Sequence, residues 1–135
     1  MSDSTQSRKE LGVQKVKEFF GDKHASELRD PAGSDIFKST AQEFIMEVCF
    51  TGYARPGLAF RERSLMNLAM LIALNRHEEL KIHLRAAFHN GLTEEQVCEA
   101  CRHAMVYCGV PAGRDALMTA SAVATQLKES GDWNQ

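Results

Sequence analysis

The chain has 135 residues, a formal net charge of −2 and 25% charged residues. That length suffices for a hydrophobic core without disulfides or structural metals. The near-neutral charge, with no basic run carrying aromatic residues, argues against nucleic acid or an acidic membrane surface as a partner. The first ten residues, MSDSTQSRKE, show no secretory signal, and the four cysteines are expected to be reduced thiols. We therefore expect a cytoplasmic protein without a membrane-spanning segment.

The first part of the chain predicts two helices. Residues 7–20 repeat apolar side chains at helical spacing and are followed by glycine, the usual C-terminal stop. Residues 21–33 are polar and contain proline and glycine, so they are expected to form a connection. Ser34 or Asp35 would then cap a second helix, which covers residues 36–52.

The most apolar segment lies in the middle of the chain. Residues 55–57, Arg-Pro-Gly, predict a turn. Residues 60–74 are apolar on nearly every side, which is typical of a buried helix. At roughly 22 Å this helix is too short to span a bilayer, and charged residues precede it. A short break at residues 75–77 separates it from a helix over residues 78–90.

The last part of the chain predicts two more helices. Thr93 and Gln96 have the spacing of a capping box and begin a helix that runs to about residue 108. Pro111 suits the first turn of a final helix that extends beyond residue 124. Because no segment shows period-two alternation, the expected fold is all-α, a compact bundle of about six helices.

One domain accounts for most of the chain. Residues 1–6 are polar and are expected to be disordered, and residues 7–130 are expected to form a single domain. The final helices are apolar on more than one side, which predicts an outer face that meets another copy of the chain. We therefore expect a homo-oligomer.

The predicted helix over residues 78–90 carries the leading catalytic candidate, His83. Glu79 lies four residues earlier, so the two side chains share one face of the helix. A carboxylate there can hydrogen-bond to the imidazole and raise its proton affinity, which suits a proton donor. A core histidine or a surface ion pair would produce the same pattern, and both alternatives stay open.

A second candidate is the pair Cys98 and Cys101, spaced as in a dithiol redox site. The spacing of Val97, Cys98, Cys101 and Cys108 also fits the buried face of a helix, where cysteine serves as a small apolar residue. A zinc site with His103 is disfavoured, because that histidine would lie on another face and no second ligand pair is near. We expect no metal.

The residues around His83 are similar to those of a known family. The segments ARPGL, RERSLMNLAMLIALNRHEELKIHLRAAFHNGLTEEQV and VYCGVPA resemble the carboxymuconolactone decarboxylase family over about residues 10–125. The resemblance implies an all-α bundle of the alkylhydroperoxidase D-like type, assembled as a trimer or hexamer with sites near subunit interfaces. It also implies cofactor-free decarboxylation of a carboxylated butenolide, of the 4-carboxymuconolactone kind, to an enol-lactone in protocatechuate and aromatic catabolism.

The resemblance also suggests roles for individual residues. His83 would be the acid that protonates the product, and Glu79 would orient it. Guanidinium groups match carboxylates, so Arg55 and Arg76 would bind the substrate. Tyr53 or Tyr107 would form a wall of the pocket or donate a hydrogen bond. The partner is thus a small carboxylated lactone.

Two other functions remain as alternatives. The redox branch of the superfamily carries CxxCxxxH; with its histidine aligned on His83, its cysteines fall at Arg76 and Glu79, and its proton-relaying glutamate falls near Ser64. A thiol-dependent antioxidant protein would therefore have to use Cys98 and Cys101. A non-catalytic protein that binds a small carboxylate is the other alternative. The chain departs from the decarboxylase pattern at residues 50–53 and 113–115, which puts the substrate in more doubt than the fold.

Overall fold

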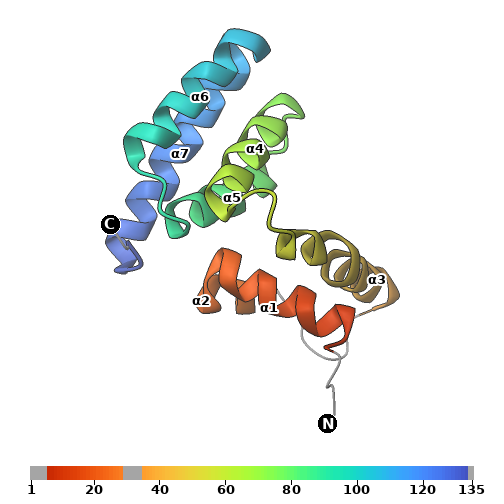
Figure 1. The fold of residues 1–135 in the computed structure, drawn as a ribbon. Helices are drawn as coiled ribbons and strands as arrows, with labels where there is room; N and C mark the ends of the chain where they lie inside the picture. Colours follow the sequence, from red (N-terminus) through yellow and green to blue (C-terminus); the bar gives the residue numbers. More distant parts are fainter. Residues whose placement is uncertain (1–5, 29–34, 134–135) are drawn as a thin grey trace. The chain divides into compact units, whose positions relative to one another are not determined.

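The computed structural model describes residues 6–28 and 35–133 (Figure 1). All regular structure in these ranges is helical and none of it is strand, so the predicted all-α fold is confirmed. Contacts divide the chain into two compact units, residues 1–58 and 59–135. Apart from Gln6, the segment predicted to be disordered lies outside the described residues. No described helix is long and apolar enough to cross a bilayer.

The first unit begins with the predicted amphipathic helix, α1 (Arg8–Phe20). The side chains of Ser7 and Glu10 form a capping box at its start, each accepting a hydrogen bond from the backbone N–H of the other residue. Gly21 ends the helix with a φ of 83°, a conformation that suits glycine. Sequence and structure agree here because the signals are local.

The predicted polar connection after α1 is wrong over its first part. Asp22–Leu28 form a helix, α2, and residues 29–34 lie outside the described part of the chain. Among the seven residues of α2 only Ala25 is buried. A helix that buries one residue has no apolar repeat, so the sequence gives no periodic signal for it.

The next predicted helix changes its winding twice. It starts as α3 (Ile36–Phe44), where the carboxylate of Asp35 accepts hydrogen bonds from two backbone N–H groups at 3.0 Å. It continues as a π-helical segment, η1 (Ile45–Cys49), and as a 3₁₀ segment, η2 (Phe50–Ala54). The predicted cap at Asp35 is confirmed, whereas Ser34 lies outside the described residues.

Aromatic side chains dominate the core of the first unit, between α1 and the η1 and η2 segments. Phe19, Phe20 and Phe50 are buried there together with Val16, Ala25 and Met46. A Cβ on Gly12 would lie 1.7 Å from the carbonyl oxygen of Met46, so only glycine lets α1 approach η1 this closely.

The second unit consists of two helical hairpins. The first pairs α4 (Phe60–Ala73) with α5 (His77–His89), and the second pairs α6 (Glu94–Cys108) with α7 (Val110–Ser130). Figure 1 shows α6 and α7 side by side. α4 also packs against α6, and α5 packs against α7, so the four helices enclose one core.

Local signals predict the ends of these helices well. Asn75 has a φ of 59° in the break before α5, and Gly91 has a φ of 90° after it. The capping box of Thr93 and Gln96 begins α6, as the spacing predicts. Pro111 lies in the first turn of α7, which is the last predicted helix.

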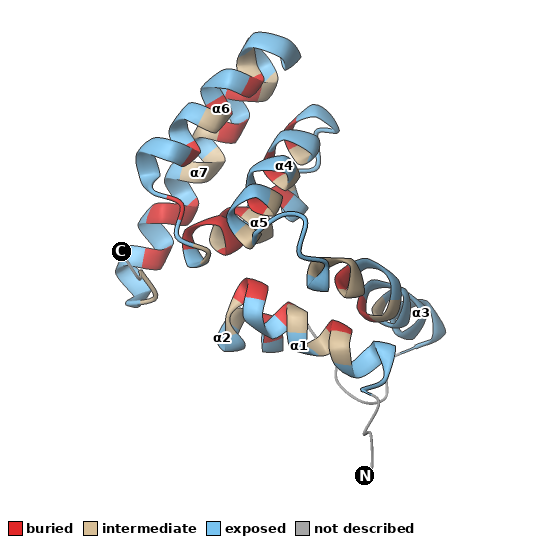
Figure 2. Ribbon diagram, viewed as in Figure 1, coloured by how far each residue is buried: buried red, intermediate tan, exposed pale blue. Residues whose placement is uncertain are grey.

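The prediction that the helix over residues 60–74 is buried on all sides is wrong for this chain. Only Ser64, Leu68 and Ile72 of α4 are buried, and their spacing of four residues places them on one face. In Figure 2 buried and exposed segments alternate along the α4 ribbon. The core of this unit also takes buried residues from the other three helices, among them Leu80, Leu84, Phe88, Val97, Cys101, Ala116, Val123 and Leu127. Leu71 is partly buried against this core, whereas Leu65, Met66 and Met70 of α4 are exposed.

Candidate functional site

His83 lies on α5, beside a fully buried stripe formed by Leu80, Leu84 and Ala87. Its own side chain is mostly buried. This position agrees with the prediction that His83 lies at the edge of the apolar face, because residues three or four apart along a helix share a face. The imidazole is therefore largely shielded from water at the interface of α5 with α4.

Asn67 of α4 is a polar neighbour of His83 across this interface. The amide Nδ2 of Asn67 lies 3.4 Å from Nδ1 of His83, and both side chains are partly buried. An amide nitrogen can only donate, so this contact uses Nδ1 of the ring as the acceptor. In that arrangement the neutral imidazole carries its hydrogen on Nε2.

Burial lowers the pKa of His83 to about 4, since the charged ring loses its hydration. The sequence predicts the opposite direction, with Glu79 raising the proton affinity of the ring. Glu79 is exposed, and desolvation is the cause of the shift in pKa. The expected effect of Glu79 is thus corrected. Although Glu79 shares a helix face with His83, its carboxylate does not raise the pKa of the ring, and His83 is neutral at pH 7.

A second polar contact joins the same two helices. Asn90 donates a hydrogen bond from Nδ2 to Oγ of Ser64 at 3.2 Å, and Ser64 is fully buried. Sequence reasoning assigned no role at this interface to Asn67 or to Asn90, which it predicted only as part of the cap that ends the helix. A signal was present, because Ser64 and Asn67 are the polar residues in the apolar run SLMNLAMLIAL and lie one turn apart.

The other predicted binding residues are divided between the two units. Tyr53 and Arg55 belong to the first. Tyr53 is partly buried and stacks on Phe50, with ring centroids 4.4 Å apart, while Arg55 is exposed just after η2. In the second unit, Arg76 is exposed at the start of α5.

Tyr107, the fourth predicted binding residue, points away from the core. Its side chain is 80% exposed on α6, and its ring contacts that of His103 at a centroid distance of 5.4 Å. The structure therefore does not bring Tyr107 into the interface between α4 and α5. Helical periodicity alone could not have shown this, because it does not reveal which neighbour covers a face.

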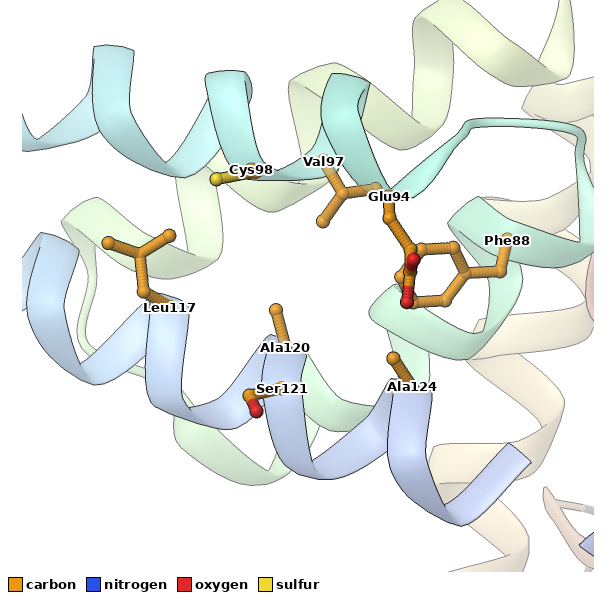
Figure 3. Close-up of a pocket in the computed structure, with 8 residues that line it drawn as sticks. All are labelled: Phe88, Glu94, Val97, Cys98, Leu117, Ala120, Ser121 and Ala124. Carbon is orange, nitrogen blue, oxygen red and sulfur yellow. The ribbon is translucent and has the colours of Figure 1, made fainter. Parts of the chain in front are cut away.

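The second unit has a small apolar pocket between α6 and α7 (Figure 3). Its volume is about 190 Å³, and His83 is not in its lining. The lining residues are Phe88, Glu94, Val97, Cys98, Leu117, Ala120, Ser121 and Ala124. Figure 3 shows Cys98 on the α6 side, opposite Leu117 of α7.

A larger and more polar hollow of about 350 Å³ lies beside α4 and α6. Its lining includes Arg61, Glu99 and His103. The guanidinium of Arg61 donates hydrogen bonds to the carbonyl oxygen of Gly91 at 2.5 Å and to Oε1 of Gln96 at 3.1 Å. Arg61 thus holds the loop between α5 and α6.

The buried member of the cysteine pair, Cys101, has the wrong properties for thiol chemistry. Cys101 is fully buried, and burial together with the neighbouring Cys98 raises its pKa to about 11. The nucleophile in disulfide exchange is the thiolate, which Cys101 does not form near neutral pH. Cys98 and Cys108 are exposed, which corrects the expectation that they share the buried face with Val97 and Cys101. All four cysteines are free.

No three His, Cys, Asp or Glu side chains in the described ranges are grouped so that they could hold a metal ion. The His83 imidazole is a polar group whose pKa is lowered by burial at the interface of α4 and α5. Together with Asn67 it forms the candidate site.

Comparison with known proteins adds the family context. The family model described as "Carboxymuconolactone decarboxylase family" matches residues 40–122, a range that includes Asn67 and His83. The chain is 35% identical over 123 residues to 4-carboxymuconolactone decarboxylase of Acinetobacter baylyi, which covers 90% of each chain. It is also 35% identical over 100 residues to nitrosuccinic acid decarboxylase npaB of Metarhizium robertsii, which covers 73% of this chain and 70% of that one.

Proposed function

This chain belongs to the carboxymuconolactone decarboxylase family, as its sequence predicts, and we propose that it is a cofactor-free decarboxylase of a small carboxylated lactone. The names of both relatives support a carboxy-lyase activity. The observation that supports a role for His83 is its burial at the interface of α4 and α5, with Asn67 at its Nδ1.

The substrate itself can supply the electron sink. In a butenolide with a carboxylate on the ring carbon next to the lactone oxygen, the C–C bond to the carboxylate breaks and CO₂ leaves. The electron pair moves through the ring double bond onto the lactone carbonyl, which gives a dienolate. A proton then adds to carbon, so each turnover consumes one proton. Nitrosuccinic acid resembles this case, because its nitro group can also accept an electron pair.

We assign that proton to His83. A neutral imidazole is a weak acid that keeps its N–H until a strongly basic dienolate forms beside it. In a site shielded from water, the same N–H can stabilise the negative charge as it develops. Water then returns a proton to the ring. This assignment replaces the imidazolium expected from the pairing with Glu79, because the pKa of His83 lies at about 4.

We propose roles for the remaining site residues in less detail. Arg76, at the exposed start of α5, would bind a substrate carboxylate by its guanidinium fork. Arg55, Tyr53 and Tyr107 are proposed to contribute to substrate binding. Each can be tested by its own variant, with a rise in KM expected for a binding residue.

The wider context also belongs to the proposal. We place the activity in protocatechuate catabolism in the cytoplasm, and we propose a trimer or hexamer. Exposed apolar side chains on α4 support self-association, because soluble monomers rarely leave such stripes uncovered.

The test is a turnover assay of the purified protein with 4-carboxymuconolactone and, separately, with nitrosuccinic acid. Loss of the butenolide absorbance and release of CO₂ are measured for the wild type and for His83→Gln. We expect the variant to lose about 10²–10⁴-fold in rate, as is typical when a general acid is removed. His89→Gln, an exposed histidine on the same helix, is the matched control and should retain the rate.

Three outcomes would contradict the proposal in different ways. Full activity of His83→Gln would remove His83 from the mechanism. Binding of the lactone without release of CO₂ would favour the non-catalytic carboxylate-binding alternative. Peroxide reduction that depends on Cys98 and Cys101 would favour the thiol alternative.

A further inference from the structure

Two of the polar contacts between α4 and α5 differ in kind. Ser64 and Asn90 pair a hydroxyl with an amide, and a hydroxyl can rotate to donate or accept. Asn67 and His83 pair an amide nitrogen with a ring nitrogen, where the direction of the hydrogen bond decides the tautomer. The second contact can therefore control the chemistry of its partner.

The amide nitrogen of Asn67 has hydrogens to give and accepts none. Facing Nδ1 at 3.4 Å, it favours a ring whose Nδ1 is bare and whose hydrogen is on Nε2. With the amide in this orientation, the opposite tautomer would set two donors against each other, and the amide would have to turn its oxygen toward the ring. Because both side chains are partly buried, water cannot easily relieve that clash, and unpaired polar groups in such places are costly.

We propose that Asn67 is a positioning residue that holds His83 as the Nε2–H tautomer. It thereby selects the ring nitrogen that presents the proton used in decarboxylation. The role in catalysis rests on the proposed function, whereas the tautomer is a property of the free protein. Asn67 itself transfers no proton and acts through the imidazole.

The tautomer is measured directly in the full-length protein, labelled with ¹⁵N-histidine, by two-bond ¹H–¹⁵N correlation spectra at pH 7. A ring nitrogen without hydrogen resonates far downfield of one that carries it. His83→Gln identifies the signals of His83 among the five histidines. We expect Nδ1 without hydrogen and Nε2 with hydrogen. A wild-type spectrum that shows the Nδ1–H form, or an average of both forms, would overturn the proposal.

Variants at Asn67 separate positioning from simple packing. Asn67→Asp has nearly the same shape but can only accept, so we expect Nδ1 to become protonated. Asn67→Leu keeps the volume without a donor and should give a mixture of tautomers. Ser64→Ala removes the contact between Ser64 and Asn90 and should leave the tautomer unchanged. An Nδ1 that stays unprotonated in Asn67→Asp would show that Asn67 does not set the tautomer.

Kinetics test the link to catalysis. We expect kcat to fall in Asn67→Asp and Asn67→Leu by up to the roughly 10²–10⁴-fold loss of a general acid, with KM changed much less. Ser64→Ala should retain kcat. A changed tautomer with an unchanged kcat would overturn the catalytic role of Asn67.

The two proposals fail in distinguishable ways. A wild-type protein that releases no CO₂ from either acid contradicts the proposed function, and the spectrum still decides the tautomer. An active enzyme whose rate depends on His83 but not on Asn67 contradicts the positioning role alone. The wild-type spectrum alone shows which ring nitrogen of His83 carries the hydrogen. The proposed tautomer can therefore be disproved even if a variant misfolds.

Discussion

Gly113 of α7 lies directly against Met105 of α6: a Cβ on Gly113 would fall 2.4 Å from the Cβ of Met105. Two non-bonded carbon atoms cannot approach so closely, so one helix would have to shift. The packing of α6 on α7 therefore requires glycine at this position. The requirement comes from close approach, since Gly113 lies within a helix and needs no unusual backbone angle.

Gly113→Ala is expected to destabilise the protein by about 1–3 kcal/mol, the usual cost of overpacking. Helix propensity alone predicts the opposite sign, a gain of up to about 1 kcal/mol. Urea unfolding measures the free energy of unfolding. Gly57→Ala is the control, because a Cβ there meets nothing within 4 Å. An unchanged or raised stability of Gly113→Ala would mean that the helices lie farther apart.

Stability should fall in acid because of His83. Its pKa is lowered from 6.5 to about 4 on folding, so the unfolded chain binds the proton at a higher pH than the folded chain. The folded state is therefore favoured above about pH 6.5 and loses on the order of 3 kcal/mol as the pH falls through this range to 4. Urea unfolding at pH 7 and at pH 4.5 measures the difference.

His83→Gln should lack this part of the pH dependence. His103→Gln, at an exposed position, is the control and should keep it. The same acid sensitivity in wild type and His83→Gln would contradict the buried, neutral state of the ring.

The two cysteines of the CxxC motif should differ in reactivity. Cys98 is exposed, whereas Cys101 is buried and its pKa is raised to about 11. Iodoacetamide added to the native protein should modify Cys98 and spare Cys101, and both should react after unfolding in urea. Peptide mass mapping identifies the modified thiols. Equal modification in the native state, or a disulfide between the two formed by peroxide, would support the thiol alternative.

A stripe on α4 predicts how self-association can be disrupted. Met66, Met70 and Leu74 are spaced by four residues along the helix and are 51%, 50% and 67% exposed. Met70→Glu would bring a charge into any interface that covers them, so the proposed trimer or hexamer should dissociate. Light scattering after gel filtration measures the mass, and Gln126→Glu on α7 is the control. A monomeric wild-type protein would contradict the proposed oligomer.

Features that depend on neighbouring residues in the chain could be predicted. The cap at Asp35, the capping box of Thr93 and Gln96, and the proline at the start of α7 all act over three or four residues. Helix α2 was missed because its single buried residue leaves no repeat to detect. The all-α class follows from the many segments that did show the period.

The candidate site could be predicted only in part. The sequence identified His83 as the residue of interest, because its place beside the apolar stripe of α5 follows from helical spacing. It predicted the wrong direction for the pKa. The sequence showed that His83 shares a helix face with Glu79. It did not show how deeply His83 is buried or that His83 contacts Asn67, sixteen residues away.

The sequence by itself determined that this chain is helical, where most helices begin and end, and which family it resembles, because these follow from local spacing and residue pattern. Tertiary structure decided which face of α4 is buried, that Cys101 is inaccessible while Cys98 is not, and that His83 is neutral. The physical reason is that burial and hydrogen bonding depend on the helix packed opposite, and periodicity along one helix does not identify its neighbour.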